Sequence, residues 1–260
     1  MNTVIVPVDF SETSFNAARY AVKLLTAHPE VEIILYNAYN KEDAEENATE
    51  NLEKFKTELL QNREANITVL TELGDFLTEL EKLARHRLAD LIIMGIKGRS
   101  SLAQVFMGTN AIKMAENKFC PVIIIPTNAA YSEIKNVLLT TDLKNTASTT
   151  PSAPIRKVLS TFQAKLHIVN VSSEHYISVS EGYAIEQQKL KEMFEEFDPE
   201  FYFLRLYDVD EAIEQLANDK NIDLIIIIHK EHSMVHKLFS SHHTKKLAYQ
   251  STMPVMVVHE

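Results

Sequence analysis

The sequence LIIMGIKGRSS at residues 91–101 is the stretch that decides how this chain folds. It starts as an apolar run of strand length that ends at Gly95, and Gly98 and Gly108 follow it. The chain has only five glycines, so most of them gather here. Because glycine lets a ligand approach the main chain closely, we expect a strand that leads into a ligand-binding loop.

The residues around these glycines suit an anion. Thr109 and Asn110 precede residues 111–115, which read as a helix, and the free N–H groups at a helix N-terminus favour negative charge. Lys97 and Arg99 add positive charge to the loop. The sequence therefore predicts a phosphate cradle, with a simple turn as the alternative explanation of each glycine.

Composition is typical of a soluble globular protein. The 260 residues, 45% hydrophobic and 24% charged, suffice for one large domain or two ordinary ones. No apolar run approaches the roughly 20 residues that span a bilayer, and no signal peptide is visible. The net charge of −10 disfavours nucleic acid and membranes as partners, and the lone Cys120 suits a reducing compartment. We expect a cytoplasmic protein.

The sequence repeats itself once. A shift of 133 residues places Asp9 on Asp142, Asn37 on Asn170, and the DLII of residues 90–93 on a second DLII, without any gap. A shift that holds from one end to the other is typical of duplicated domains. It predicts a domain at residues 1–128 and another at 133–260, separated near residues 127–132.

Each copy reads as five short apolar strands that alternate with helices. This pattern predicts a parallel sheet covered on both faces, that is, a doubly wound α/β domain. Ligands of such sheets bind beyond the carboxyl ends of the strands, where Asp9 and Gly95 are expected. The strands are predicted at residues 3–8, 31–37, 67–72, 91–94 and 121–126, and again at 136–141, 165–171, 200–207, 223–228 and 254–259.

The first helix of the second copy is expected to start late. Pro151 and Pro154 fall where the first copy has mid-helix alanines. Proline is unfavourable inside a helix by about 3 kcal/mol. Residues 144–152 are therefore predicted to form a loop.

Three segments, in this order, resemble the universal stress protein family in its ATP-binding branch. They are VPVDFS at residues 6–11, the spacing Gly-x2-Gly-x9-Gly-Thr that starts at Gly95, and CPVIII at residues 120–125. The resemblance implies two tandem five-stranded sheets of strand order 3-2-1-4-5, Rossmann-like and of the adenine nucleotide alpha hydrolase type. It also implies ATP or another adenine nucleotide as the ligand, with or without Mg²⁺, and a contact from Asp9 to the adenosine end.

The predicted nucleotide contacts combine strand ends with the glycine loop. The resemblance implies that the main chain of Asn37 and Ala38 borders the adenine. Each contact has a structural alternative, such as a helix cap at Asp9 or a plain strand end at Asn37. No catalytic residue is predicted, because we find no Walker lysine loop and no nucleophile with an orienting partner. The full set is Pro7, Val8, Asp9, Asn37, Ala38, Met94, Gly95, Lys97, Gly98, Arg99, Gly108, Thr109 and Asn110.

The second copy lacks this cradle. The shift places Ile228, Glu231 and Ser241 where the first copy has its three loop glycines, so we predict that the second domain does not bind ATP in the same way. Half of the chain's histidines lie in this region instead, and they read either as a divalent metal site or as a solvated cluster. They are His229, His232, His236, His242 and His243.

The sequence thus favours a tandem nucleotide-binding protein with a regulatory role in the stress response. Two other classes stay open: a slow ATPase or adenylate-transferring enzyme on the same fold, and a metal or small-molecule sensor that acts through the histidines. The expected partners are the nucleotide, the sister domain through pairing of the fifth strands, and a second copy of the chain in a homodimer.

Overall fold

The computed structural model describes residues 1–40, 45–61, 63–96, 109–127, 129–171, 181–204, 209–229 and 253–260. The chain divides into two compact units, Met1–Ser132 and Glu133–Glu260. The predicted domain limits, 1–128 and 133–260, stay a prediction. Each unit is an α/β domain, so the predicted tandem α/β fold is confirmed.

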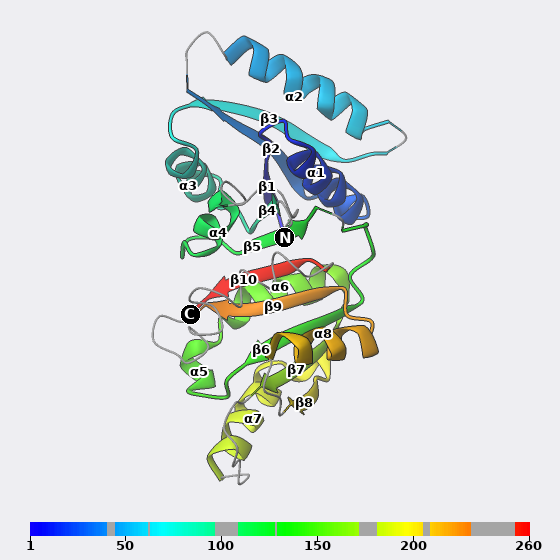
Figure 1. Ribbon diagram of the computed structural model, residues 1–260, viewed down its shortest axis with the longest axis vertical. Helices are drawn as coiled ribbons and strands as arrows, with labels where there is room; N and C mark the ends of the chain where they lie inside the picture. Colours follow the sequence, from blue (N-terminus) through cyan, green and yellow to red (C-terminus); the bar gives the residue numbers. More distant parts are fainter. Residues whose placement is uncertain are drawn as a thin grey trace. The chain divides into compact units, whose positions relative to one another are not determined.

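The first unit is a doubly wound parallel sheet (Figure 1). Its strands pair in the order β3-β2-β1-β4-β5, as the resemblance implied. Helices α1 and α2 cover one face and α3 and α4 the other, which is the arrangement that right-handed crossovers produce. The elements are β1 (Thr3–Pro7), α1 (Glu12–Leu25), β2 (Glu32–Tyr39), α2 (Glu45–Leu59), β3 (Asn66–Leu73), α3 (Phe76–His86), β4 (Leu91–Ile96), α4 (Thr109–Ala115) and β5 (Val122–Pro126).

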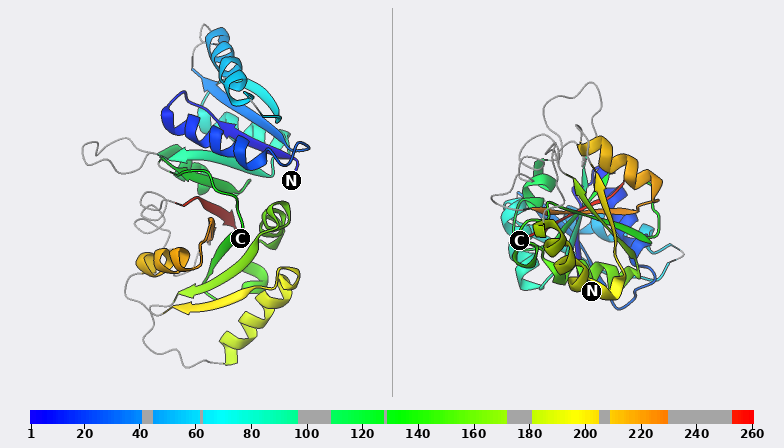
Figure 2. Two further views of the ribbon diagram at one scale, coloured as in Figure 1. Left: turned by 90° about the vertical axis from the view of Figure 1, so that its right-hand side faces the viewer. Right: turned by 90° about the horizontal axis from the view of Figure 1, so that it is seen from below.

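The second unit repeats this plan with the strand order β8-β7-β6-β9-β10. Helices α6 and α7 lie on one side of its sheet and α8 on the other (Figure 2). The elements are β6 (Asn136–Thr141), α5 (Thr146–Thr149), α6 (Ser152–Phe162), β7 (Lys165–Val171), α7 (Glu181–Met193), β8 (Glu200–Leu204), α8 (Val209–Asp219), β9 (Leu224–His229) and β10 (Val255–His259). The predicted strand at 200–207 is described only as far as Leu204.

The predicted loop at residues 144–152 needs a correction. It contains one helical turn, α5, and the chain then breaks at Thr150 before α6 begins at Ser152. Pro154 lies in the first turn of α6, where its missing N–H removes no helical hydrogen bond. The first helix of this unit is therefore split into two helices.

The duplication extends to single hydrogen bonds. Asn37 Nδ2 donates to the Val8 carbonyl at 2.7 Å, and Asn170 Nδ2 donates to the Thr141 carbonyl at 3.0 Å. Phe10, after the first strand, has φ 61°, and its counterpart Leu143 has φ 52°. A shift of 133 residues therefore relates structure as well as sequence.

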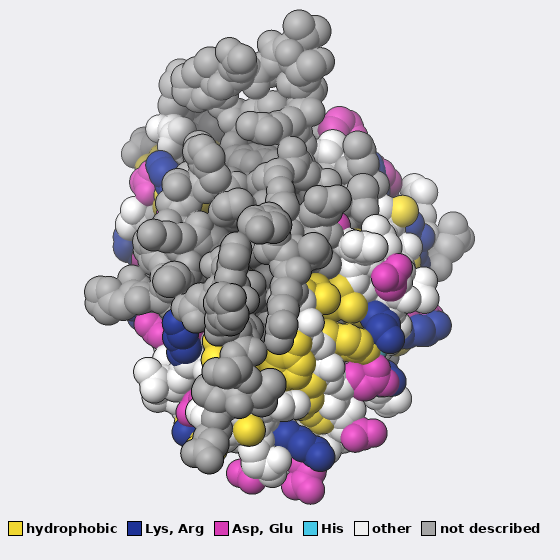
Figure 3. All heavy atoms as spheres, turned by 60° about the horizontal axis from the view of Figure 1, so that its bottom comes forward, with side chains coloured by type: hydrophobic (Ala, Val, Ile, Leu, Met, Phe, Trp, Pro, Cys, Tyr) yellow, Lys and Arg dark blue, Asp and Glu magenta, His cyan; other side chains and the backbone are white. Residues whose placement is uncertain are grey.

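The strands form the core, and the surface mixes charges. All five residues of β1 are buried, and so are the first five of β9. On the face seen in Figure 3, hydrophobic side chains gather among basic and acidic ones. Ile185 and Phe203, on α7 and β8, are large apolar side chains that stay exposed. In the part of the chain that the structure describes, no helix is long and apolar enough to cross a membrane.

A buried histidine lies at the amino end of β7. His167 is 3% exposed, and its ring nitrogens contact Tyr202 Oη at 3.1 Å and Asn136 Oδ1 at 3.3 Å. Burial lowers the pKa of His167; Glu200 acts in the opposite sense, whereas Lys165 and Lys220 lower it further. Hydrogen bonds from Lys165 and Tyr202 hold the pKa of Glu200 at about 2, so Glu200 stays ionised near neutrality.

We expect the second unit to lose stability as the pH falls. Unfolded histidine titrates near pH 6.5 and folded His167 below that value, so the unfolded chain binds the extra proton first. The free energy of unfolding should therefore decrease from about pH 6.5 downward, and this component should vanish in H167Q. Urea unfolding at a series of pH values measures it. The exposed His86 supplies the control, since H86Q should keep the wild-type slope.

Candidate functional site

A cavity of about 330 Å³ opens in the first unit, at the carboxyl ends of β1 and β4. These two strands are neighbours in the sheet. The chain reverses its strand order between them, and such switch points are where doubly wound sheets bind ligands. The described residues that line the cavity are Pro7, Val8, Asp9, Ser11, Thr13, Ser14, Asn37, Ala38, Phe76, Met94, Gly95, Asn110 and Ala111.

Asp9 is the charged side chain among the described residues that line the cavity. Its Oδ1 accepts hydrogen bonds from Ser11 N at 3.1 Å and Ser11 Oγ at 2.5 Å, while Ser14 Oγ accepts one from Asp9 N at 3.3 Å. The loss of solvent around the carboxyl group raises its pKa, but the hydrogen bonds with Ser11 and Ser14 outweigh this effect and lower the pKa below its usual value. Asp9 is therefore a fixed, ionised acceptor.

The same serines begin helix α1. Ser11 is the N-cap, with φ −80° and ψ 154°, and its Oγ accepts a hydrogen bond from Ser14 N at 3.3 Å. Ser14 Oγ donates back to the Ser11 carbonyl at 2.9 Å. Because α1 starts against the cavity, its first turn and the Asp9 carboxylate form one hydrogen-bonded rim.

The close approach of α1 explains Gly95. A Cβ built on Gly95 would lie 2.3 Å from the Thr13 carbonyl oxygen and 2.7 Å from its carbon. Gly95 lines the cavity as predicted, but the reason it must be glycine is that the backbone of α1 packs directly on β4. The sequence interpretation assigned this glycine to the approach of phosphate, and the structure supplies a packing reason instead.

Asn37 also has a structural role. Its side chain is buried, and its amide nitrogen is engaged by the Val8 carbonyl. Asn170 repeats this bond in the second unit, where the glycine loop is absent, so the bond ties neighbouring strand ends and is independent of the loop. Asn37 and Ala38 line the cavity, but the Asn37 side-chain amide is already used in this bond between strand ends.

The structure brings together most of the predicted residues that it describes. Of the predicted set, Thr109 begins α4, and Lys97, Gly98, Arg99 and Gly108 lie outside the described residues. The lining residues that the prediction missed are Ser11, Thr13, Ser14, Phe76 and Ala111. The polar run SETS at residues 11–14, directly after the first strand, carried a signal for the first three.

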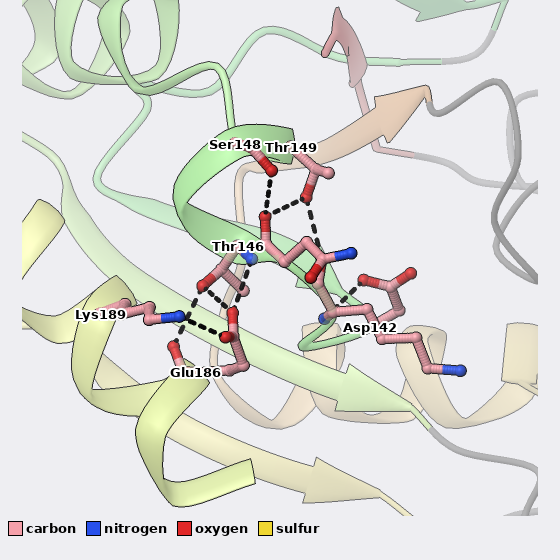
Figure 4. A network of polar contacts seen from close by, with 8 residues as sticks. Asp142, Thr146, Ser148, Thr149, Glu186 and Lys189 are labelled. Atoms are coloured by element: carbon pink, nitrogen blue, oxygen red, sulfur yellow. Dashed lines mark hydrogen bonds and ion pairs between the residues drawn. The ribbon is translucent and has the colours of Figure 1, made fainter. Parts of the chain in front are cut away.

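The second unit begins the same way and then diverges. Asp142 Oδ1 accepts a hydrogen bond from Lys144 N at 3.1 Å, as Asp9 does from Ser11. Thr146, the counterpart of the cavity-lining Thr13, instead donates to Glu186 Oε2 of α7, from its N at 2.7 Å and its Oγ1 at 2.6 Å (Figure 4). Hydrogen bonds from Lys189 and Thr146 lower the pKa of Glu186 to about 2.

This divergence follows from one side chain. Ile228 occupies the position of Gly95 and is 2% exposed. Since even a Cβ there would collide with a first turn placed like that of α1, the turn at Thr146 must stand farther from its strand. The separate α5 turn, held by a carboxylate from α7, is the result.

The histidines of the second unit are described only in part. His229 ends β9, and its ring centroid lies 5.2 Å from that of His259 on the neighbouring β10. His232, His236, His242 and His243 lie outside the described residues. Within the described ranges, no group of three or more His, Cys, Asp or Glu side chains is arranged to hold a metal ion.

Fold and cavity together define a tandem doubly wound α/β protein with a cavity at the switch point of its first sheet. The chain belongs to the universal stress protein family: the family model matches residues 1–126 and again residues 134–259.

Individual proteins and solved structures are similar to this chain. Universal stress protein MJ0531 of Methanocaldococcus jannaschii is 26% identical over 136 residues, which are 47% of this chain and 80% of the relative. The crystal structure of a universal stress protein from Archaeoglobus fulgidus matches with a TM-score of 0.72 at 19% identity, covering 99% of this chain and 98% of its own. A universal stress protein solved in complex with cAMP covers 48% of this chain and 97% of its own, with 21% identity and a TM-score of 0.40.

Replacing Gly95 by alanine should destabilise the first unit. The atoms it would strike belong to the Thr13 backbone and cannot rotate away, so overpacking should lower the free energy of unfolding by about 1–3 kcal/mol. Urea unfolding measures the loss. G182A, at an exposed position inside α7, is the control and should leave stability equal or slightly higher. Unchanged stability in G95A would contradict the packing explanation.

Proposed function

We propose that the first unit binds an adenine nucleotide, ATP or a close relative, and that occupancy regulates the protein in a stress response. The main support is Asp9, an ionised acceptor fixed by Ser11 at the rim of a cavity. A carboxylate of this kind accepts hydrogen bonds from hydroxyl groups, such as those of a ribose. The cavity volume of about 330 Å³ lies within the usual range for small-molecule sites.

The charge of the wall supports an orientation for this ligand. Among the described lining residues there is no lysine or arginine, and Asp9 is the ionised group. Phosphates would be repelled there, so the nucleoside is the part that suits this end of the cavity. We place the phosphates toward the glycine loop, for which Lys97 and Arg99 are the cations that the sequence offers. Mg²⁺ stays a prediction of the sequence.

The proposal assigns the second unit a structural or regulatory role. Ile228 in place of Gly95, and Glu231 in place of Gly98, support a unit that does not take nucleotide in the same way. Association of the two units through their fifth strands, and a homodimer, remain proposals that accompany this one. So do the domain limits 1–128 and 133–260.

Asp9 and Asp142 form a matched pair for testing the site. In D9N the negative acceptor is lost, and hydrogen bonds to charged groups contribute about 1.5–3 kcal/mol, so ATP affinity should fall about 10- to 100-fold. D142N makes the same change at the equivalent turn of the second unit and should leave affinity unchanged. Isothermal titration calorimetry compares the two. Equal effects from both variants, or none from D9N, would refute the proposed site.

Mass analysis of ligand released from purified protein identifies the nucleotide. Intact nucleotide is expected from the wild type, and none from G98E, which copies Glu231 of the second unit. Steady hydrolysis of ATP by the wild type, abolished in G98E, would instead support the enzyme class. Recovery of equal nucleotide from G98E would show that the glycine loop does not hold it.

A further inference from the structure

Phe76 supplies the aromatic surface of the cavity. It is the first residue of α3, is half-buried, and is the one aromatic side chain among the described residues that line the cavity. The remaining described lining consists of aliphatic, small and polar side chains. Phe76 and the fixed Asp9 carboxylate both line the cavity, so an apolar ring and a negative charge share its wall.

The local chain holds Phe76 firmly. Gly74 has φ 147°, which side-chain-bearing residues rarely adopt, and its N–H donates to the Tyr39 carbonyl at 3.0 Å. Asp75 caps α3, accepting a hydrogen bond from Thr78 N at 3.0 Å. The turn from β3 into α3 is thus fixed on both sides, and Phe76 follows it directly.

A second aromatic ring supports Phe76 from the core. The rings of Tyr36 and Phe76 have centroids 6.5 Å apart and planes inclined by 35°, within the range of interacting aromatic pairs. Tyr36 is fully buried on β2. With the turn beneath it and a buried ring beside it, Phe76 has little freedom to leave the cavity wall.

The negative charge nearby determines which part of a ligand can lie against the Phe76 ring. Burial raises the pKa of Tyr36, and the carboxylates of Glu72, Glu79 and Asp75 raise it further, so these negative charges lie near the ring that supports Phe76. Asp9 adds another at the cavity wall. A phosphate would be repelled by these charges. A neutral, flat heterocycle meets no such repulsion and can stack on the ring.

We propose that Phe76 is the stacking surface for the base of the bound nucleotide. This inference rests on the proposed function and adds a specificity-determining residue to it. A ring that stacks on a base contacts its face and leaves its hydrogen-bonding edge unread, so Phe76 should strengthen the binding of any purine nucleotide over a ligand without a base. Choice of adenine over guanine would then come from other groups.

Replacing Phe76 by an aliphatic side chain of similar volume tests the proposal. F76L should weaken ATP binding about tenfold, in line with the range found when stacking side chains are removed. GTP, where it binds, should weaken by the same factor, and tripolyphosphate, which lacks a base, should bind F76L as it binds the wild type. Calorimetry measures all three. F203L, a change at an exposed phenylalanine of the second unit, should bind ATP like the wild type.

A fluorescence measurement tests the contact directly. The chain contains no tryptophan, so F76W carries a single reporter at this position. Its emission should change when ATP is added and stay constant with tripolyphosphate. If wild-type protein binds ATP but F76L binds it equally and the F76W emission does not respond, stacking is refuted while the proposed function stands. An equal loss of ATP and tripolyphosphate in F76L also refutes stacking, since it indicates a general structural role. If wild-type protein binds no nucleotide, the proposed function itself fails.

Discussion

The seating of α1 on β4 is the contact on which the rest of the first unit's site depends. It requires a strand residue without a side chain, because a Cβ on Gly95 would lie 2.3 Å from the Thr13 carbonyl oxygen. With the helix in this position, Ser11 and Ser14 meet Asp9 and fix its charge. One missing methyl group thus determines where the helix starts, and the helix start determines the chemistry of the rim.

The two units show how a shared plan diverges at one place. Both keep an aspartate after the first strand, then a residue in the left-handed conformation, and both tie the first two strands with an asparagine amide. The structures of the two units differ at the turn that follows. In the first unit the turn opens onto a cavity, and in the second it is bound by Glu186 of its own α7. The difference between the halves is therefore local, and Ile228 is a side chain that excludes a turn placed like that of α1.

Much of the fold and part of the cavity lining could be predicted from the sequence because the signals were local or periodic. Apolar runs located the strands, the gapless shift located the duplication, and family resemblance supplied the strand order. Strand ends such as Asp9 and Met94 were placed at the cavity because parallel strands end at one edge.

What could not be predicted involves contacts between distant segments. The reason for Gly95 lies in the approach of Thr13, which is remote in sequence. The amphipathic pattern of α3 does not reveal that its first residue, Phe76, meets β2 and the cavity. The α5 turn was missed because it depends on a carboxylate from α7.

The split between α5 and α6 has a consequence for how this gene can change. Returning Ile228 to glycine would remove a buried side chain, and moving the turn at Thr146 to the place that Thr13 has in the first unit would drive its carbonyl into the isoleucine. Each of these two changes would destabilise the second unit unless the other had already occurred. Once the two halves had diverged in this way, no series of single neutral mutations could restore the first arrangement, so steric exclusion keeps the halves distinct.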